Sequence, residues 1–323
     1  SAVALSVTID GNATALTYLW QYSYNQLDWT DIDATNSTYT APTTTGGTTY
    51  YRCEVTTGCG GKATSKVFKV IVCFTAVQDK EENWYCTGNF GDAGYWMTMN
   101  LRSTRNNLYE DLTAISTTPE DVSKKYYYYP NQDISLITTH PEYGLLYTWA
   151  AASGRTAAGT DGSDARHQGI CPVGWHLPSD KDWAKLEKEV ASNPAAYSTQ
   201  TTKYALADTY EYDTTTAWRP GPTNTDDSDT WWGRQMKSQT PVYAYSTGGT
   251  SKGFNSDGFD ALLVGWVTAG GGWSNYGSFA MYWSATSTES EKAYSRALGS
   301  GRSGASRDSS SKMYRASVRC MQD

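Results

Sequence analysis

Residues 169–187, which read GICPVGWHLPSDKDWAKLE, constrain the fold more than any other stretch of this sequence. Pro172 and Pro178 fix the backbone on either side of a tight turn, because the proline ring locks φ. Trp175 and His176 lie between them, and we expect both to hold the turn against the core. A general-base role for His176 is the functional alternative, but no nucleophile or carboxylate accompanies it at a spacing typical of catalysis. A structural histidine is the better interpretation.

A helix should follow this turn directly. Ser179 is the expected N-cap, with Asp182 at the N3 position, which is a capping-box arrangement. Trp183, Leu186 and Val190 then recur at helical spacing, so one face of the helix should be buried.

The rest of the chain predicts a mainly β protein. Among the 323 residues, Tyr (25) and Trp (13) are abundant, Phe (6) is scarce and Gly occurs 29 times. Short alternating strands, glycine turns and serine loops dominate, and only DTWWGRQMKS, residues 229–238, predicts a second short helix. The expected fold class is mainly β with an α+β C-terminal part, and the length allows two domains.

Charge and cysteine content narrow the class of protein. The net charge is −7 and the sequence pI about 5.1, which disfavours nucleic acid as a partner because phosphate binding needs clustered Lys and Arg. No apolar run approaches the ~20 residues of a membrane span, and the sequence opens on strand-like SAVALSVTID rather than on a signal peptide. Six cysteines without a CxxC pair suit disulfides of an exported protein.

Residues 1–72 are expected to form an immunoglobulin-like β-sandwich that acts as a spacer. Trp20 lies on the alternating strand LTYLWQYS, and TTYYRCEVTT and TSKVFKVIV are two further runs joined by the glycine-rich hairpin GCGGKA. Tyr51 lies two residues before Cys53, which is the spacing of a tyrosine corner. No cysteine precedes Trp20, so Cys53 either pairs with Cys59 across the hairpin or stays buried and free.

Residues 73–323 form the second predicted domain. Cys73 and Cys86 bracket an expected hairpin and could close it with a disulfide. A bridge from Cys171 to Cys320 would close a loop of about 150 residues and stabilise the fold by about 5 kcal/mol in the chain-entropy model. Termini tied together around a long irregular region are a C-type-lectin-like arrangement.

Six motifs occur in order along this second domain. They are YWMTMNLRST (95–104), YGLLYTWAAA (143–152), GICPVGWHLPSDKDWAKLE (169–187), GFDALLVGW (258–266), YWSATS (282–287) and ASVRCMQD (316–323). This series resembles the FISUMP family, the major paralogous domain of bacterial surface proteins, over about residues 75–323. The resemblance implies an exported protein, lipid-anchored or carried on a larger surface structure, with a C-type-lectin-like fold and a structural Cys320.

A second resemblance concerns the C-terminal segment. Some proteins with this domain are variable proteins of diversity-generating retroelements, in which adenine changes diversify the last segment on a fixed scaffold. The matching scaffold residues are Trp283, Ala293, Arg296, Leu298, Val318, Arg319 and Cys320. Between them lie residues that adenine changes in an Asn codon can reach, namely Ser295, Ala297, Gly299, Ser300, Gly301, Ser303, Gly304, Ser306, Asp308, Ser309 and Ser310. An ordinary polar surface loop explains the same residues.

We expect a ligand-binding surface here, because Tyr and Trp give stiff contact area while Ser, Gly and Asn adapt to a partner. Trp273 and Tyr276 lie in a glycine-rich loop and should be exposed, whereas Trp266 and Trp283 lie in family motifs and should be core. The expected binding residues are Trp273, Asn275, Tyr276, Tyr294, Ser295, Ala297, Gly299, Ser300, Ser303, Ser306, Asp308 and Ser310.

The expected function is therefore that of a surface adhesin or receptor-binding protein on a bacterial cell. Its partner would be a protein or glycan on another cell, and no cofactor, metal or catalytic residue is required. A structural fibre or pilus subunit that assembles through its N-terminal region is the alternative.

An enzyme is the third class. A glycosidase needs two carboxyl groups at a set separation, and the sequence offers Asp226, Asp227, Asp229, Asp257 and Asp260. Acidic, solvated loops explain these better. The EPN, QPD and WND motifs of calcium-dependent sugar binding are absent, and no set of oxygen ligands specifies a calcium ion.

Overall fold

The chain divides into two compact units, Ser1–Phe74 and Thr75–Asp323. The division lies two residues after the boundary expected from the sequence. A computed structural model describes residues 3–10, 14–24, 26–108, 110–115, 119, 121–155, 165–203, 217–219, 232–240, 242, 248–253, 258–302 and 304–323.

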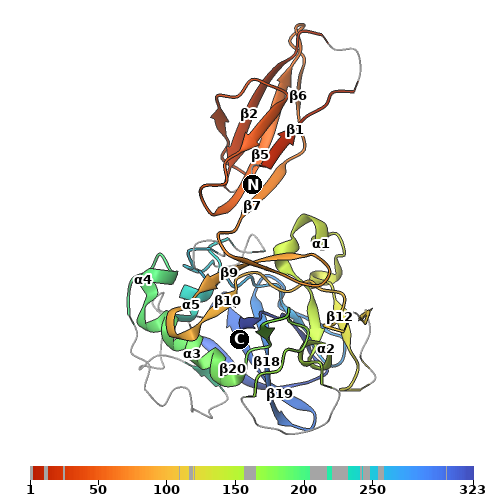
Figure 1. Cartoon of the computed structure of the whole chain (residues 1–323), viewed down its shortest axis with the longest axis vertical. Helices are drawn as coiled ribbons and strands as arrows, with labels where there is room; N and C mark the ends of the chain where they lie inside the picture. Colours follow the sequence, from red (N-terminus) through yellow and green to blue (C-terminus); the bar gives the residue numbers. More distant parts are fainter. Residues whose placement is uncertain are drawn as a thin grey trace. The chain divides into compact units, whose positions relative to one another are not determined.

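The N-terminal unit is a β-sandwich of two unequal sheets (Figure 1). The small sheet pairs β1 (Val3–Ser6) with β4 (Thr38–Ala41). The large sheet has the order β3-β2-β5-β6, with β7 also paired to β5. Its strands are β2 (Thr17–Ser23), β3 (Thr30–Ile32), β5 (Gly47–Thr56), β6 (Lys62–Thr64) and β7 (Phe68–Val72).

One hydrophobic cluster joins the two sheets of this sandwich. Leu5 and Ala41 of the small sheet pack with Trp20 and Tyr51 of the large one. Trp20 is fully buried, and its indole N–H donates to the carbonyl of Asn36 at 2.9 Å.

The expected pairing of Cys53 with Cys59 is wrong, because both are free thiols. Cys53 is fully buried beside Trp20, while Cys59 is exposed on the hairpin turn. The last paired residue, Thr56, lies three residues beyond Cys53 along the strand, a span of roughly 10 Å at about 3.3 Å per residue. A disulfide needs the two Cα atoms within about 7 Å. The other alternative, a buried and free Cys53, is what the fold adopts.

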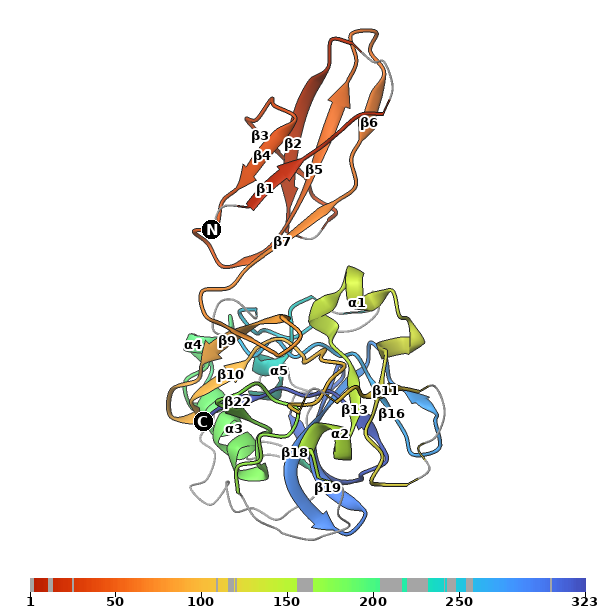
Figure 2. The ribbon, with the colours of Figure 1, turned by 45° about the vertical axis from the view of Figure 1, so that its right-hand side comes forward.

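The described residues of the C-terminal unit form three sheets (Figure 2). The first, in the order β14-β22-β10-β9-β8, comprises β8 (Ala76–Gln78), β9 (Trp84–Asn89), β10 (Tyr95–Met97), β14 (Trp175–His176) and β22 (Met321–Gln322). The second, in the order β11-β12-β13-β21-β16-β17, comprises β11 (Thr113–Ala114), β12 (Tyr126–Tyr128), β13 (Leu146–Thr148), β16 (Trp266–Val267), β17 (Trp273–Ser274) and β21 (Arg315–Ala316). The third, in the order β15-β20-β19-β18, comprises β15 (Ala217–Arg219), β18 (Phe279–Glu289), β19 (Lys292–Gly299) and β20 (Ala305–Ser311).

Helices in the described residues are short apart from one. The α-helices are α1 (Leu136–Thr139), α2 (Trp149–Ser153), α3 (Asp180–Ser192), α4 (Pro194–Tyr197) and α5 (Trp232–Met236), with 3-10 turns η1 (Gly91–Ala93), η2 (Pro130–Gln132) and η3 (Pro141–Tyr143). The capping box at the start of α3 is confirmed, with Ser179 and Asp182 bonded reciprocally. The buried face of α3 and the second helix, α5, are also as predicted. The mainly β fold class is confirmed.

Aromatic side chains form the main core of this unit. Trp183 of α3 lies edge-on to Trp96 of β10 at 5.0 Å between ring centroids and to Phe259 at 5.7 Å. Phe259 in turn lies 5.8 Å from Tyr282 of β18. The helix therefore joins strands of two different sheets through one aromatic cluster.

Candidate functional site

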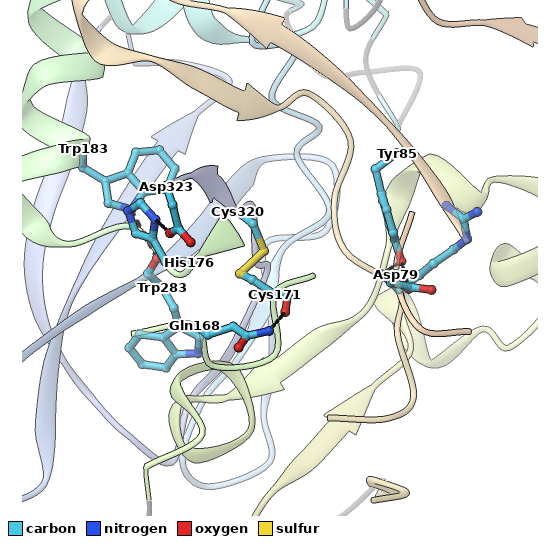
Figure 3. Close-up of a disulfide and its surroundings, with 10 residues drawn as sticks. Asp79, Tyr85, Gln168, Cys171, His176, Trp183, Trp283, Cys320 and Asp323 are labelled. Carbon is cyan, nitrogen blue, oxygen red and sulfur yellow. Dashed lines mark hydrogen bonds and ion pairs between the residues drawn. A yellow bond between two sulfur atoms is a disulfide. The ribbon is translucent and has the colours of Figure 1, made fainter. Parts of the chain in front are cut away.

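The segment before α3 pairs with the C-terminal strand through β14 and β22, and two side-chain links add to this pairing (Figure 3). Cys171 and Cys320 form a disulfide with a sequence separation of 149 residues, which is the predicted bridge. Cys73 and Cys86 are also both disulfide-bonded, as expected. His176 and Asp323 make the second link, with His176 Nδ1 lying 2.8 Å from the Asp323 carboxylate.

His176 serves this fastening. It is 1% exposed, and its Nε2 lies 3.6 Å from Asp182 Oδ2. Burial alone would raise the pKa of Asp182, but the neighbouring His176 ring and hydrogen bonds from Ser179 lower it overall. The Ser179 hydroxyl donates to Asp182 at 2.7 Å and caps the helix. The geometry thus supports a structural histidine in a turn that tethers the last strand.

One face of the sheet that contains β18, β19 and β20 is anchored to α3 by arginine side chains. Arg296 of β19 donates to Glu187 at 2.7 Å and to Asp180 at 2.7 Å, both on α3. Arg307 of β20 also donates to Asp180, at 2.7 Å, and its guanidinium lies 3.6 Å from the centroid of the Tyr294 ring. Because the shared carboxylate accepts from both arginines, α3 holds two neighbouring strands in one buried network.

The opposite face carries the small residues expected to bind a ligand. Alternate strand residues point to opposite faces, and the register places Ser295 opposite Asp308 and Ala297 opposite Ser306. The hydroxyls of Ser295 and Ser310 lie 2.9 Å apart. Six of the predicted binding residues, those at positions 295, 297, 299, 306, 308 and 310, therefore share one face of a paired ladder.

Most of that face is not open in this arrangement. Ser295 is 1% exposed and Ser306 is 2% exposed. The remaining buried members of the predicted set are Ala297, Gly299 and Ser310, while Asp308 is half-buried. The segment expected as an exposed serine loop forms the strands β19 and β20. Most of their small side chains are buried because larger neighbouring groups cover them.

Both turns of the β18–β19–β20 meander are held by buried lysines. The ammonium of Lys237, which is 2% exposed, donates to the carbonyls of Gly299 at 2.6 Å, Ser300 at 3.4 Å and Arg302 at 2.7 Å. Lys312 donates to the carbonyls of Glu289 and Ser290, both at 3.1 Å. Each ammonium donates to two or more backbone carbonyls of one turn, so the turn backbone is held from inside.

The turn after β19 lies beside an aromatic pair. Trp266 of β16 and Phe279 of β18, both half-buried, meet edge-on at 5.7 Å between centroids. A Cβ on Gly299 would lie 2.6 Å from Phe279 Cε1, so the ring can sit over this strand only because residue 299 is glycine. The Ser300 N–H donates to the Ser278 carbonyl at 2.7 Å, which ties this turn to the one before β18.

Polar residues occupy the turn before β18 and the turn after β19. Asn275 and Arg302 are exposed, and Ser278 and Ser300 are half-buried. Asn275 has a φ of +66°, and its carbonyl accepts from Ser278 and Phe279, both at 2.9 Å. We call this set the tip surface and define it by Trp266, Asn275, Ser278, Phe279, Ser300 and Arg302.

The other predicted residues lie in several places. Tyr276 is half-buried against a hydrophobic cluster instead of exposed, and burial raises the pKa of its phenol. Trp283 is core as expected, but Trp266 is half-buried. Tyr294 is half-buried under Arg307. Trp273 lies in β17, and its side chain is outside the described residues, as are Ser303, Asp226, Asp227, Asp229 and Asp257.

Asp260 corrects a further expectation, because it is 5% exposed and is not part of a solvated loop. Its carbonyl accepts from the buried Arg319 at 2.9 Å. Four members of the tip surface were not selected as binding residues from the sequence, namely Trp266, Ser278, Phe279 and Arg302. Nor was Lys237, since no local pattern marks a lysine that serves a turn 62 residues away.

Metal and membrane features were searched within the described part of the chain. It contains no group of three or more His, Cys, Asp or Glu side chains placed to hold a metal ion. None of its helices combines the length and apolar character that a membrane crossing needs.

Two family models match the sequence. Residues 92–322 match the model described as Fibrobacter succinogenes major domain (Fib_succ_major). Residues 2–73 match a domain of unknown function, DUF8696. The first match spans well over half of the chain. Neither the curated proteins nor the solved structures compared with the chain gave a match.

Proposed function

Because the chain belongs to the Fibrobacter succinogenes major domain family, the FISUMP family that its motifs predicted, we propose that it binds a ligand at the bacterial surface through its tip surface. The family implies a surface-related protein and is not an enzyme class. The finer role, an exported adhesin or receptor-binding protein whose partner is a protein or glycan of another cell, is our proposal.

One observation carries this proposal. The tip surface places a half-buried aromatic pair next to exposed polar side chains on turns whose backbone is fixed. Rigid aromatic contact area costs little conformational entropy on binding, and Asn and Arg supply directional hydrogen bonds. A prearranged surface avoids the cost of ordering a loop when the ligand arrives.

Binding to a printed panel of purified glycans and glycoproteins tests the proposal. Trp266→Ala and Arg302→Ala should each weaken binding to any positive spot by about tenfold or more, as expected for central aromatic and Arg contacts. Trp84→Ala is the matched control, because Trp84 is 57% exposed on β9. Equal losses for the Trp266 and Trp84 variants would exclude the tip surface as the binding site.

Diversification by a retroelement is a second, separable proposal. It is favoured by the division of β19 and β20 into an anchored face and a face of small residues. The test is a search beside the gene for a near-copy of its last ~130 bases that differs at adenines, next to a reverse transcriptase gene. Its absence would remove this proposal and leave the tip surface unaffected.

A further inference from the structure

The small sheet of the N-terminal unit consists of two strands in the part of the chain that the structure describes. Among the described residues, β1 pairs only with β4 and β4 only with β1. In an antiparallel pair, about half of the N–H and C=O groups of each strand point away from the partner. Both outer edges of the small sheet therefore present backbone groups that a further strand could bind. An added strand would also stabilise the sheet, because a two-stranded sheet is marginally stable by itself.

The two sheets of the sandwich differ in how their edges are protected. The edge strands of the large sheet carry charges, namely Asp31 in β3, Lys62 in β6 and Lys69 in β7. The small sheet has none, since β1 reads VALS and β4 reads TYTA, and it has no proline. Charged side chains and prolines are the usual devices that keep an edge from pairing with another chain. Here they protect one sheet only.

We propose that the β1–β4 sheet accepts an extended strand from another polypeptide. The incoming segment would add to one outer edge by main-chain hydrogen bonds, with its alternate side chains completing the sandwich core. This proposal concerns the N-terminal unit and does not depend on ligand binding at the tip surface.

The chemistry of the strand follows from the burial pattern along the small sheet. Leu5 and Ala41 point inward and are buried, Val3 and Tyr39 are half-buried, and the residues between them are exposed. An added strand would therefore present apolar residues inward, beside Val3 and Tyr39, and small uncharged residues outward. The partner is a segment with this alternation and without charge or proline.

Hydrogen exchange of the whole chain with a defined peptide tests the proposal. The probe is acetyl-KGTVTVTVTVGK-amide, and the control peptide has proline in place of each valine. The probe should slow exchange about tenfold at amides of β1 or β4 and leave β6 and β7 unchanged. The proline peptide should give no protection.

Variants that place a lysine on an edge strand test the same proposal. Ala4→Lys on β1 or Thr40→Lys on β4 should abolish the protection, whereas Thr64→Lys on the exposed edge strand β6 should not. Ala4→Thr, which adds no charge, should retain it and controls for misfolding. Absence of protection by the probe, or equal protection by both peptides, would overturn the proposal. Dimerisation of the chain alone that Ala4→Lys removes would also overturn it, because the edge would then be occupied by a second copy.

Discussion

At the scale of single residues, most of the predicted binding positions lie on β19 and β20. In the structure, positions 295, 297, 299, 306, 308 and 310 share one face of β19 and β20, because side chains alternate along a strand. These positions were selected from the sequence, but a loop was expected there. Their burial could not be read from the sequence, because it depends on groups distant in the chain. Ser295 and Ser310 are 15 residues apart, yet their hydroxyls meet at 2.9 Å.

Gly299 provides the first test at this scale. Gly299→Ala would place a Cβ 2.6 Å from the ring of Phe279, so either the ring or the strand must move. We expect a loss of about 1–3 kcal/mol in the free energy of unfolding, as for other overpacked sites. Gly301→Ala is the control, because a Cβ there meets nothing within 4 Å. Denaturant unfolding of both variants measures the difference, and equal losses would contradict this account of Gly299.

Asp180 provides the second test at the scale of single residues. Burial alone would raise its pKa, but Arg296 and Arg307 lower it below the ordinary value of 3.8. A carboxyl with a lowered folded-state pKa adds stability above its unfolded pKa, and that stability is lost as the pH falls through the folded pKa. Wild-type stability should therefore fall steeply below about pH 4.

Asp180→Asn should flatten this acid limb and cost about 3 kcal/mol or more at neutral pH, because it leaves two buried arginines short of a carboxylate. Asp92→Asn, at an exposed position of η1, should do neither. Unfolding curves measured across the acid range provide the comparison. An unchanged acid limb in Asp180→Asn would show that another carboxyl causes it.

At the level of elements, the sequence predicted the helix that depends on neighbouring residues. It did not predict the strands that depend on residues distant in the chain. The capping box and apolar spacing of α3 lie within residues 179–190 and were confirmed. The hairpin of β19 and β20 was expected as a loop, because its serines and glycines have low strand propensity. Pairing with β18 and the buried arginines override that propensity.

Removal of the Lys237 ammonium tests whether this residue stabilises the turn between β19 and β20. Lys237→Met keeps most of the side-chain volume but removes the donor to three carbonyls of the 299–302 turn. Amide exchange in residues 299–302 should become about tenfold faster, since each lost hydrogen bond costs about 1 kcal/mol. Lys292→Met, at the exposed first residue of β19, should leave that exchange unchanged. If the turn keeps its protection without Lys237, the lysine does not fix it.

At the level of the whole molecule, the cysteines fall into a bonded group and a free group. The predicted Cys171–Cys320 bridge exists, and Cys73 and Cys86 are disulfide-bonded. Cys53 and Cys59 are free thiols, one buried and one exposed. The sequence offered both outcomes for Cys53, and only the burial of its strand decides between them.

Thiol titration tests this directly. The native chain should show one reactive thiol, Cys59, because Cys53 is buried and burial raises the pKa of its thiol. Unfolding without a reductant should raise the count to two. A count of zero in the unfolded, unreduced chain would mean that Cys53 and Cys59 are bonded after all.

The central claim is that a ligand occupies the tip surface, and oxidative footprinting of the chain with a bound glycan or glycoprotein from the panel tests it most directly. The account predicts that the ligand protects Trp266 from oxidation and leaves Trp84 of β9 as reactive as in the free chain. Protection of Trp84 with Trp266 unchanged would contradict it and place the binding site elsewhere on the molecule.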